Sequence, residues 1–364
     1  MKKTLLILAA AAAVAACTPK QRWHRDEGAA WGTLYHITYH ATASLHDSIR
    51  AVMREVELSV SPFEPASALT AFNAGRSDRL DAMAAGLVAE SQRVWHLSGG
   101  MFDPTVMPLV ELWGFGPGGQ TSEPTQAQID SALAMVGLGE CRMKPDGSFV
   151  RKHPHTRLDF SSIAKGAGVD AVAAMLRRNG AERYMVEIGG EVATGGMNPR
   201  GERWRIQVDA PADDPEGLRH DRLLMLNLDG GRCVATSGNY RNYRLLADGG
   251  RTGHIISPLT GQVACRHYDV VVGRRPVASA CRHDAHHAAA GFVGGPGHGG
   301  HEACVHASVH QCGAACAYPC ACGACSPLPV LGQIGHGAAI YGNSYSVFHN
   351  GAKIRFSVRF CNSR

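Results

Sequence analysis

Side chains suited to phosphate chemistry gather where one helix is predicted to begin. Asp159 ends a short extended run, and Ser161 and Ser162 follow it as potential helix caps. Lys165 then lies one turn into the helix. Because a helix N-terminus exposes unpaired backbone N–H groups and carries partial positive charge, this place suits a phosphate. Asp159 and Ser162 could hold a cation through oxygen, so the segment indicates a phosphoanhydride site with bound Mg²⁺.

The elements around these residues follow from the apolar pattern. The helix is predicted from apolar residues at helical spacing, namely Ile163, Val169, Val172 and Leu176. Gly180 ends it. A strand is predicted over residues 184–188, and the sequence Gly189-Gly190-Glu191 ends that strand where the backbone must approach another group closely.

A purely structural interpretation of the same residues stays open. Asp159 and Ser161 would then only cap the helix, and Lys165 would be a solvated charge in its first turn. The spacing matches neither the GxxxxGK[ST] loop nor the GxGxxG loop, so phosphate binding cannot be inferred from those motifs.

A known family resembles this stretch. Residues 159–166, DFSSIAKG, and residues 186–191, VEIGGE, resemble the ApbE family, the FAD:protein FMN transferases. The resemblance extends over about residues 30–270, through motif blocks in the family's order. It implies an α+β fold with antiparallel sheets, packed helices and two lobes around a flavin cleft. The alternating strand and helix signals agree with that fold class.

The N-terminal part of the resemblance supplies aromatic residues. Residues 30–39 alternate as a strand and include Trp31, where the family has a Met that touches the flavin. Trp31 could still stack on an isoalloxazine or adenine ring. A helix is predicted over residues 43–60, and the segment 61–73 places Phe63 at the family's aromatic position. The resemblance implies that Phe63 packs on the cofactor, and a core Phe in a proline-bounded turn is the alternative.

A longer matching run follows an amphipathic helix predicted over residues 80–98, which a glycine pair ends. Residues 100–116, GMFDPTVMPLVELWGFG, closely resemble a run of the family. By that resemblance Met101, Phe102 and Asp103 line the FAD site. The prolines and glycines of the run favour a fixed loop over a helix.

Two final blocks, residues 234–243 and 253–261, complete the match and contain one candidate histidine. His254 can accept a proton near neutral pH, and a hydrogen-bonded structural role is its alternative. The resemblance counts Ile256 with His254 among the cofactor contacts. Ser257 stands where the family usually has Asp, a departure that bears on how His254 is oriented.

The resemblance implies a transfer reaction at phosphorus. FAD would be the donor, Mg²⁺ would neutralise its pyrophosphate, and a Thr or Ser hydroxyl of a target protein would attack the flavin-side phosphorus as AMP leaves. Lys165 would steady the phosphates, and Ser162 would contribute to the metal site. Asp159 would bind the cofactor and help to activate the acceptor, with His254 as proton acceptor. Two other functions stay open: a lipoprotein that binds or hydrolyses FAD without transfer, and a lipoprotein that binds metal.

The N-terminus indicates export. Residues 1–16 place two lysines before an apolar run, which is typical of a signal peptide and too short for a membrane span. The sequence Val14-Ala15-Ala16-Cys17 looks like a bacterial lipobox, so Cys17 would carry lipid and residues 17–29 would form a tether. Ordinary cleavage nearby is the alternative. We expect an enzyme anchored in the bacterial cell envelope and facing the periplasm. The family resemblance implies that its targets are flavoprotein subunits of membrane electron-transport complexes.

Residues 30–272 are expected to form the flavin-transferase domain. The chain has 364 residues, 45% of them hydrophobic, which is ample for a core. A further helix and two strands are predicted, over residues 125–136, 204–208 and 223–228. The net charge of +5 comes largely from scattered arginines and does not indicate nucleic acid as a partner. Cys141 and Cys233 could pair, and isolated buried thiols are the favoured interpretation.

After about Val272 the sequence changes character, and residues 273–364 are set apart as an aberrant tail. Residues 273–325 are a Gly, Ala, His and Cys mixture from which a globular core is not expected. One interpretation is a metal-binding appendix, although only Cys322-x-x-Cys325 has the usual knuckle spacing and exported thiols tend to oxidise. We favour a shifted reading frame. The segment Cys281-Arg282-His283-Asp284 can be encoded so that reading one base later gives Ala-Asp-Thr-Thr, close to the family's metal-binding segment. The family's C-terminal Asp and Thr ligands for Mg²⁺ would then be absent from this chain.

Overall fold

The helices and strands come from a computed structural model that describes residues 20–118, 122–209, 220–238, 242–246, 251–263, 267–274, 305–311, 344–349 and 352–360. Within these ranges the helices are α2 His46–Val60, α3 Ala68–Asn73, α4 Ala82–Ser98, α5 Met107–Leu112, α6 Gln126–Leu133, the 3₁₀ helix η1 Leu138–Glu140, and α7 Ala164–Arg178. The strands are β1 Arg22–Ala30, β2 Thr33–Ala41, β3 Arg142–Met143, β4 Phe149–Val150, β5 Tyr184–Ile188, β6 Glu191–Gly195, β7 Trp204–Asp209, β8 Arg222–Leu228, β9 Arg232–Gly238, β10 Tyr243–Leu245, β11 Arg251–Gly253, β12 His267–Arg274, β13 Val305–Gln311, β14 Ser344–His349 and β15 Ala352–Phe360.

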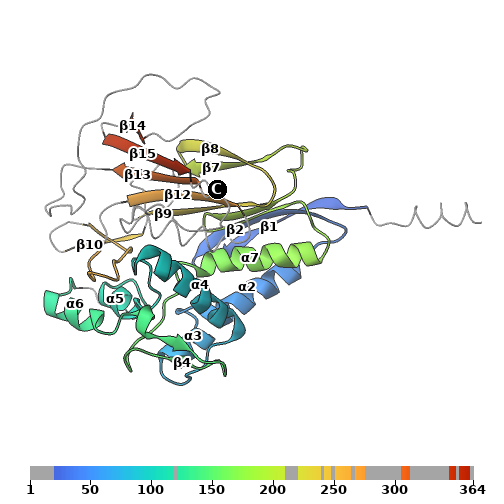
Figure 1. Ribbon diagram of the computed structural model, residues 1–364. Coiled ribbons are helices and arrows are strands. Elements are labelled where there is room, and N and C mark those ends of the chain that lie inside the picture. The colour runs from blue at the N-terminus through green and yellow to red at the C-terminus, as the bar shows by residue number, and fades with distance from the viewer. Residues whose placement is uncertain are drawn as a thin grey trace, which may run out of the picture.

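One long sheet runs through the molecule and is the central element of the fold (Figure 1). Its nine described strands lie in the order β1-β2-β5-β6-β9-β12-β13-β15-β14. Each neighbouring pair is antiparallel. The predicted α+β class with antiparallel sheets is therefore confirmed.

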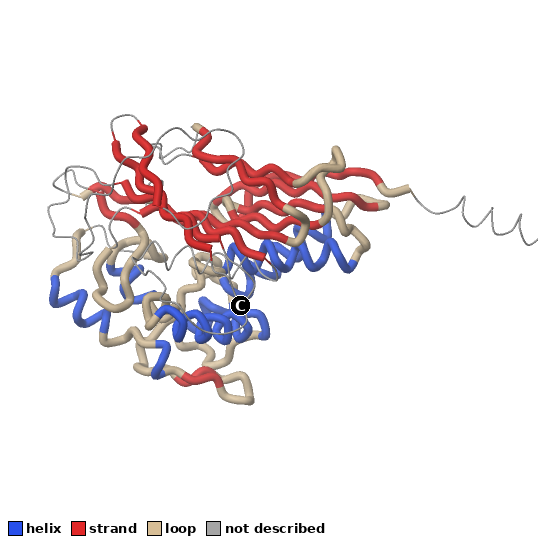
Figure 2. The backbone as a smooth tube through the Cα atoms, turned by 45° about the horizontal axis from the view of Figure 1, so that its top comes forward, coloured by secondary structure: helices blue, strands red, loops and turns tan. Residues whose placement is uncertain are grey.

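The helices gather on one side of this sheet (Figure 2). Alternate residues of β5 are buried, and Val186 packs in one cluster with Val172 of α7 and Ile49 of α2. On the other face the hairpin β7-β8 covers the sheet, where Trp204 packs with Val192. The start of α7 is thus held between the sheet and the helices beyond it.

A second apolar cluster, built around α3 and α4, anchors the segment that precedes α7. Phe160 and Ile163 are fully buried in it. The Asn73 side chain fixes Leu158, the residue before Asp159. Its amide donates to the Leu158 carbonyl at 2.7 Å, and its oxygen accepts from the Leu158 N–H at 2.8 Å. The candidate phosphate segment therefore has a fixed backbone on both sides.

A third cluster joins α5 and α6 to the segment 251–263. Leu109, Ile129 and Ile256 share it. The Trp113 indole N–H donates to the Gly261 carbonyl at 2.7 Å. This contact holds the loop that carries His254 against the rest of the molecule.

The predicted helices over 43–60, 80–98 and 125–136 are confirmed with shorter ends. α2 begins at His46 and α6 covers only Gln126–Leu133. α4 begins after Asp81, whose side chain accepts from the Ala84 N–H, and it ends at Ser98 because Gly99 adopts φ 61.

The prediction that residues 100–116 form a loop without a helix is wrong in part. α5 lies inside the run, with Pro108 in its first turn. A proline there removes an N–H that has no partner within a helix anyway, so its ring does not oppose the helix.

The N-terminal boundary also differs from the expectation. Residues 22–29, assigned to a tether, belong to β1, which pairs with β2 along its length. The single strand predicted over 30–39 is instead the turn Trp31-Gly32 followed by β2. The edge strand of the sheet therefore begins only a few residues after the proposed lipidation site.

The sheet extends past the expected boundary at residue 272. β12 continues to Arg274, and β13 pairs with both β12 and β15, although no core was expected from residues 273–325. Cys322, Cys325 and the segment 281–284 lie outside the described residues, so both interpretations of the tail stay hypotheses.

Cys141 is a free thiol, so it does not pair with Cys233. Cys233 is disulfide-bonded, so its interpretation as an isolated thiol is wrong. Burial raises the pKa of the Cys141 thiol above its ordinary value. In the part of the chain that the structure describes, no helix combines the length and apolar character needed to cross a bilayer. Residues 1–16, the predicted signal peptide, lie outside that part.

Candidate functional site

One cavity of about 630 Å³ collects residues from segments far apart in the chain. Its wall combines the β1-β2 turn, the end of α2 with the loop after it, the run 101–115, the start of α7 and residues 254–258. Small-molecule sites have volumes of about 300–1,000 Å³. Every site residue named from the sequence lines this cavity: Trp31, Phe63, Met101, Phe102, Asp103, Asp159, Ser162, Lys165, His254 and Ile256.

Asp159 lies almost buried at the cavity wall, with 8% of its surface exposed. Its backbone N–H donates to the Pro104 carbonyl at 2.7 Å. Its Oδ1 accepts from the Ser161 N–H at 2.8 Å and from the Ser161 hydroxyl at 2.5 Å. Burial raises the pKa of the Asp159 carboxyl above its ordinary value, although the Ser161 hydrogen bonds oppose that shift.

The prediction that Ser161 and Ser162 cap α7 is wrong. The N-cap residue is Ile163, and no side chain makes a cap hydrogen bond there. Ser161 instead turns back to Asp159. The first turn of α7 faces the cavity with Ala164 and Lys165 in its wall. A helix start without a side-chain cap suits an anion.

Asp103 has a structural role, because its hydrogen bonds fix the loop that forms part of the cavity wall. Its Oδ1 accepts from the Thr105 N–H at 2.8 Å and from the Thr105 hydroxyl at 2.5 Å, and its Oδ2 accepts from the Leu138 N–H at 2.8 Å. Burial raises the pKa of the Asp103 carboxyl. Both oxygens are thus engaged in fixing the loop beside Met101 and Phe102.

Trp31 stands in the β1-β2 turn with φ 52, a left-handed conformation that few residues other than glycine adopt. Its indole lies over Gly168 of α7, where an added Cβ would meet the ring at 2.1 Å. Sequence reasoning missed Gly168. A glycine inside a helix is the signal that could have pointed to a close approach.

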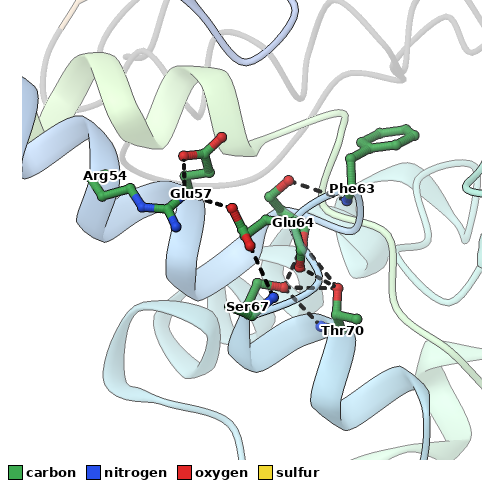
Figure 3. A network of polar contacts seen from close by, with 8 residues as sticks. Arg54, Glu57, Phe63, Glu64, Ser67 and Thr70 are labelled. Carbon is green, nitrogen blue, oxygen red and sulfur yellow. Dashed lines mark hydrogen bonds and ion pairs between the residues drawn. The ribbon is translucent and has the colours of Figure 1, made fainter.

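Phe63 projects from the loop between α2 and α3, with 61% of its surface exposed (Figure 3). Arg54 Nη1 contacts Glu57 at 2.5 Å and Glu64 at 2.6 Å, which ties the loop to α2. Ser67 caps α3 through the Thr70 N–H. The loop therefore has a fixed shape while the ring that it presents stays accessible.

His254 is oriented by one carbonyl. Its Nδ1 lies 3.0 Å from the Asn242 oxygen. Because a carbonyl can only accept, Nδ1 carries a proton, and Nε2 is the nitrogen that can accept one when the ring is neutral. The Phe115 ring stands at an angle to the imidazole, with 6.2 Å between centroids. Asn242 and Phe115 both line the cavity, and sequence reasoning assigned neither a role.

Comparison with known proteins decides the family. The model of the ApbE family matches residues 31–296 of the chain. The chain belongs to the ApbE family. An FAD:protein FMN transferase of Vibrio cholerae is 36% identical over 274 residues, which is 72% of this chain and 79% of that protein. The FAD:protein FMN transferase of Haemophilus influenzae is 34% identical over 279 residues, with the same two shares.

Solved structures of ApbE proteins have the same fold. The flavin transferase ApbE from Vibrio cholerae superposes with a TM-score of 0.64 at 31% identity, covering 73% of this chain and 86% of that one. The flavinyl transferase ApbE of Pseudomonas stutzeri, in its apo form, gives 0.64 at 29% identity, covering 74% and 85%. The family match also continues past residue 270, the approximate end of the resemblance seen in the sequence.

The donors of this ApbE-family cavity fit Mg²⁺ held partly by substrate. Mg²⁺ takes oxygen ligands and commonly binds one or two carboxylates together with phosphates and water. Asp159 and Ser162 supply oxygen at the cavity wall. In the described ranges, no group of three or more His, Cys, Asp or Glu residues could enclose a metal ion without such help.

Proposed function

We propose that the chain is an FAD:protein FMN transferase that moves FMN from FAD to a Thr or Ser hydroxyl of a target protein and releases AMP. The observation that carries the proposal is the single cavity in which Lys165, Asp159, His254 and the aromatic residues Trp31 and Phe63 meet. Similar proteins of the family bear the name of this activity.

The residues divide the work between binding and proton transfer. Trp31 and Phe63 offer flat surfaces for the flavin and adenine rings, and Lys165 with the start of α7 binds the diphosphate. The acceptor hydroxyl gives its proton to Nε2 of His254 as its oxygen bonds to the flavin-side phosphorus. The anhydride bond to the adenylate side breaks, and AMP leaves with the bond's electrons. Mg²⁺ held by Ser162 and Asp159 would neutralise charge on the phosphates.

The targets are proposed to be flavoprotein subunits of membrane electron-transport complexes in the bacterial envelope. Lipidation at Cys17 would hold the enzyme at the membrane surface, facing the periplasm, near such subunits. Globomycin-sensitive processing and incorporation of labelled palmitate test the anchor. A Cys17→Ala variant that still incorporates palmitate would contradict it.

Incubating the protein with FAD, Mg²⁺ and a candidate target subunit is expected to give a fluorescent flavin band on the denatured target, with AMP released in equal amount. Omitting Mg²⁺ or adding a chelator should remove the band. FAD that stays bound without a covalent product indicates a binding protein. FMN and AMP formed without a labelled target indicate hydrolysis, in which water replaces the acceptor hydroxyl. Either of these results would contradict the transferase.

Replacing Gly168 with alanine is expected to weaken FAD binding about fivefold, because the new methyl group displaces the Trp31 indole and its stacking contact is worth roughly 1 kcal/mol. Titration of flavin fluorescence measures the Kd. Gly86→Ala is the matched control, since Gly86 lies inside α4 with no atom within 4 Å of an added Cβ. It should leave the Kd unchanged and stabilise the fold by about 0.4–1 kcal/mol. Equal Kd values for the two variants would show that Trp31 has no part in binding.

A further inference from the structure

Glu191, the first residue of β6, has a fully buried carboxylate next to the cavity lysine. Its Oε2 lies 3.8 Å from the Lys165 Nζ, and the Lys165 side chain is 27% exposed. A buried carboxylate is unfavourable unless an opposite charge or hydrogen bonds compensate it. Lys165 supplies such a charge, and it lines the cavity whereas Glu191 does not.

The β5-β6 turn fixes the position of this carboxylate. Gly189 and Gly190 have φ 59 and φ 90, and the Gly190 N–H donates to the Glu187 side chain at 2.7 Å. A Cβ added to Gly189 would lie 3.2 Å from the Lys165 Cδ. The lysine stem therefore rests on the same turn that presents Glu191.

The distance between the Lys165 ammonium and the Glu191 carboxylate is longer than a hydrogen bond. Hydrogen bonds from N–H to O have lengths of about 2.7–3.2 Å, so the 3.8 Å pair of Lys165 and Glu191 is held by charge. An ammonium group has three donors, and this contact uses none of them. The Lys165 ammonium is thus attracted to a fixed, buried charge beside the cavity wall.

We propose that Glu191 is a positioning residue, which holds the Lys165 ammonium at the cavity wall where the diphosphate of a dinucleotide binds. The inference rests on the proposed function and assigns a role to a side chain that does not line the cavity. Removing the Glu191 charge should therefore weaken FAD binding, because the Lys165 ammonium loses the buried charge that attracts it to this position. A carboxylate that only repelled the diphosphate would have the opposite effect.

The test is the pair Glu191→Gln and Glu182→Gln. The first keeps the shape of the side chain and is expected to raise the Kd for FAD about tenfold, with KM rising more than kcat falls. The second removes the same charge from an exposed side chain just before β5, and Glu182 does not line the cavity. It should leave the Kd unchanged. An unchanged or lower Kd in Glu191→Gln would overturn the proposal.

A double-mutant cycle asks whether Glu191 acts through Lys165. Lys165→Met alone is expected to raise the Kd about 10–100-fold, and adding Glu191→Gln should cause no further loss. The melting temperature gives a second readout: Lys165→Met should lower it by leaving a buried charge, and the double variant should regain part of the loss. Additive effects on both readouts would overturn the proposal. Neither the Kd nor the melting temperature depends on flavin transfer. A wild-type protein that binds FAD without labelling its target would therefore contradict the proposed function but not the role of Glu191.

Discussion

Replacing His254 with alanine is expected to lower the rate of flavin transfer about 10²–10⁴-fold while FAD stays bound. Nδ1 of His254 points at the Asn242 carbonyl, so Nε2 is the nitrogen that can take the proton of the acceptor hydroxyl. Alanine has no such group. The lysine and the aromatic surfaces that we propose bind FAD are unchanged. The measurement is the initial rate of covalent flavin fluorescence on the target at saturating FAD, together with the Kd for FAD.

His220→Ala is the control for this variant. His220 is exposed and pairs with Asp209 at 2.7 Å beside the β7-β8 hairpin, and it is absent from the cavity wall. It should transfer flavin at the wild-type rate. Added imidazole should restore part of the activity of His254→Ala if the ring acts as a base. Undiminished transfer by His254→Ala would assign His254 a structural role.

The start of α7 shows what the sequence could and could not predict. The residue types, the helix and the strand after it follow from spacing and apolar pattern, and the structure confirms those elements. The serine caps were wrong because packing decides where this helix begins. Phe160 and Ile163 are fully buried on either side of the serines, which fixes the backbone and leaves Ser161 to bond Asp159. Local capping preference is a weaker force than such burial.

The contacts that shape the cavity were beyond local patterns. Trp31 meets Gly168, and Lys165 meets Glu191, only because the sheet brings the β1-β2 turn and the β5-β6 turn beside α7. Periodicity predicts which face of an element is buried, but not which side chain of another element it meets. The gathering of ten residues in one cavity could be anticipated from the family resemblance alone, since no spacing rule joins residues 31 and 254.

The second large effect is expected for Asp159→Asn, which should lower flavin transfer at least about 10²-fold while leaving the fold as stable as before or more so. Burial holds the pKa of Asp159 above its ordinary value of 3.8. A group with a raised folded pKa contributes stability at pH values below its unfolded pKa, and that contribution is lost as pH rises through the folded pKa. Ionisation of this buried carboxyl therefore costs stability, and a neutral amide removes that cost.

The hydrogen bonds allow this substitution at Asp159 and forbid it at Asp103. The Ser161 N–H and hydroxyl both donate to Oδ1 of Asp159, so an asparagine can keep its oxygen there and turn its NH₂ elsewhere. Asp103 accepts a backbone N–H on each oxygen, so either orientation of an amide sets one N–H against another. Asp103→Asn should lose about 1–3 kcal/mol of stability.

Thermal melting of the two variants in chelator at pH 7, beside the transfer assay, separates catalysis from folding. Asp159→Asn is expected to melt at the wild-type temperature or roughly 2–4 °C above it, which corresponds to about 1 kcal/mol for a domain of this size. Asp103→Asn should melt lower, and its loss of transfer should follow its loss of folded protein. If Asp159→Asn transferred flavin normally, the carboxylate would have no part in binding the metal or activating the acceptor, and the cavity would depend on Lys165 and His254 instead.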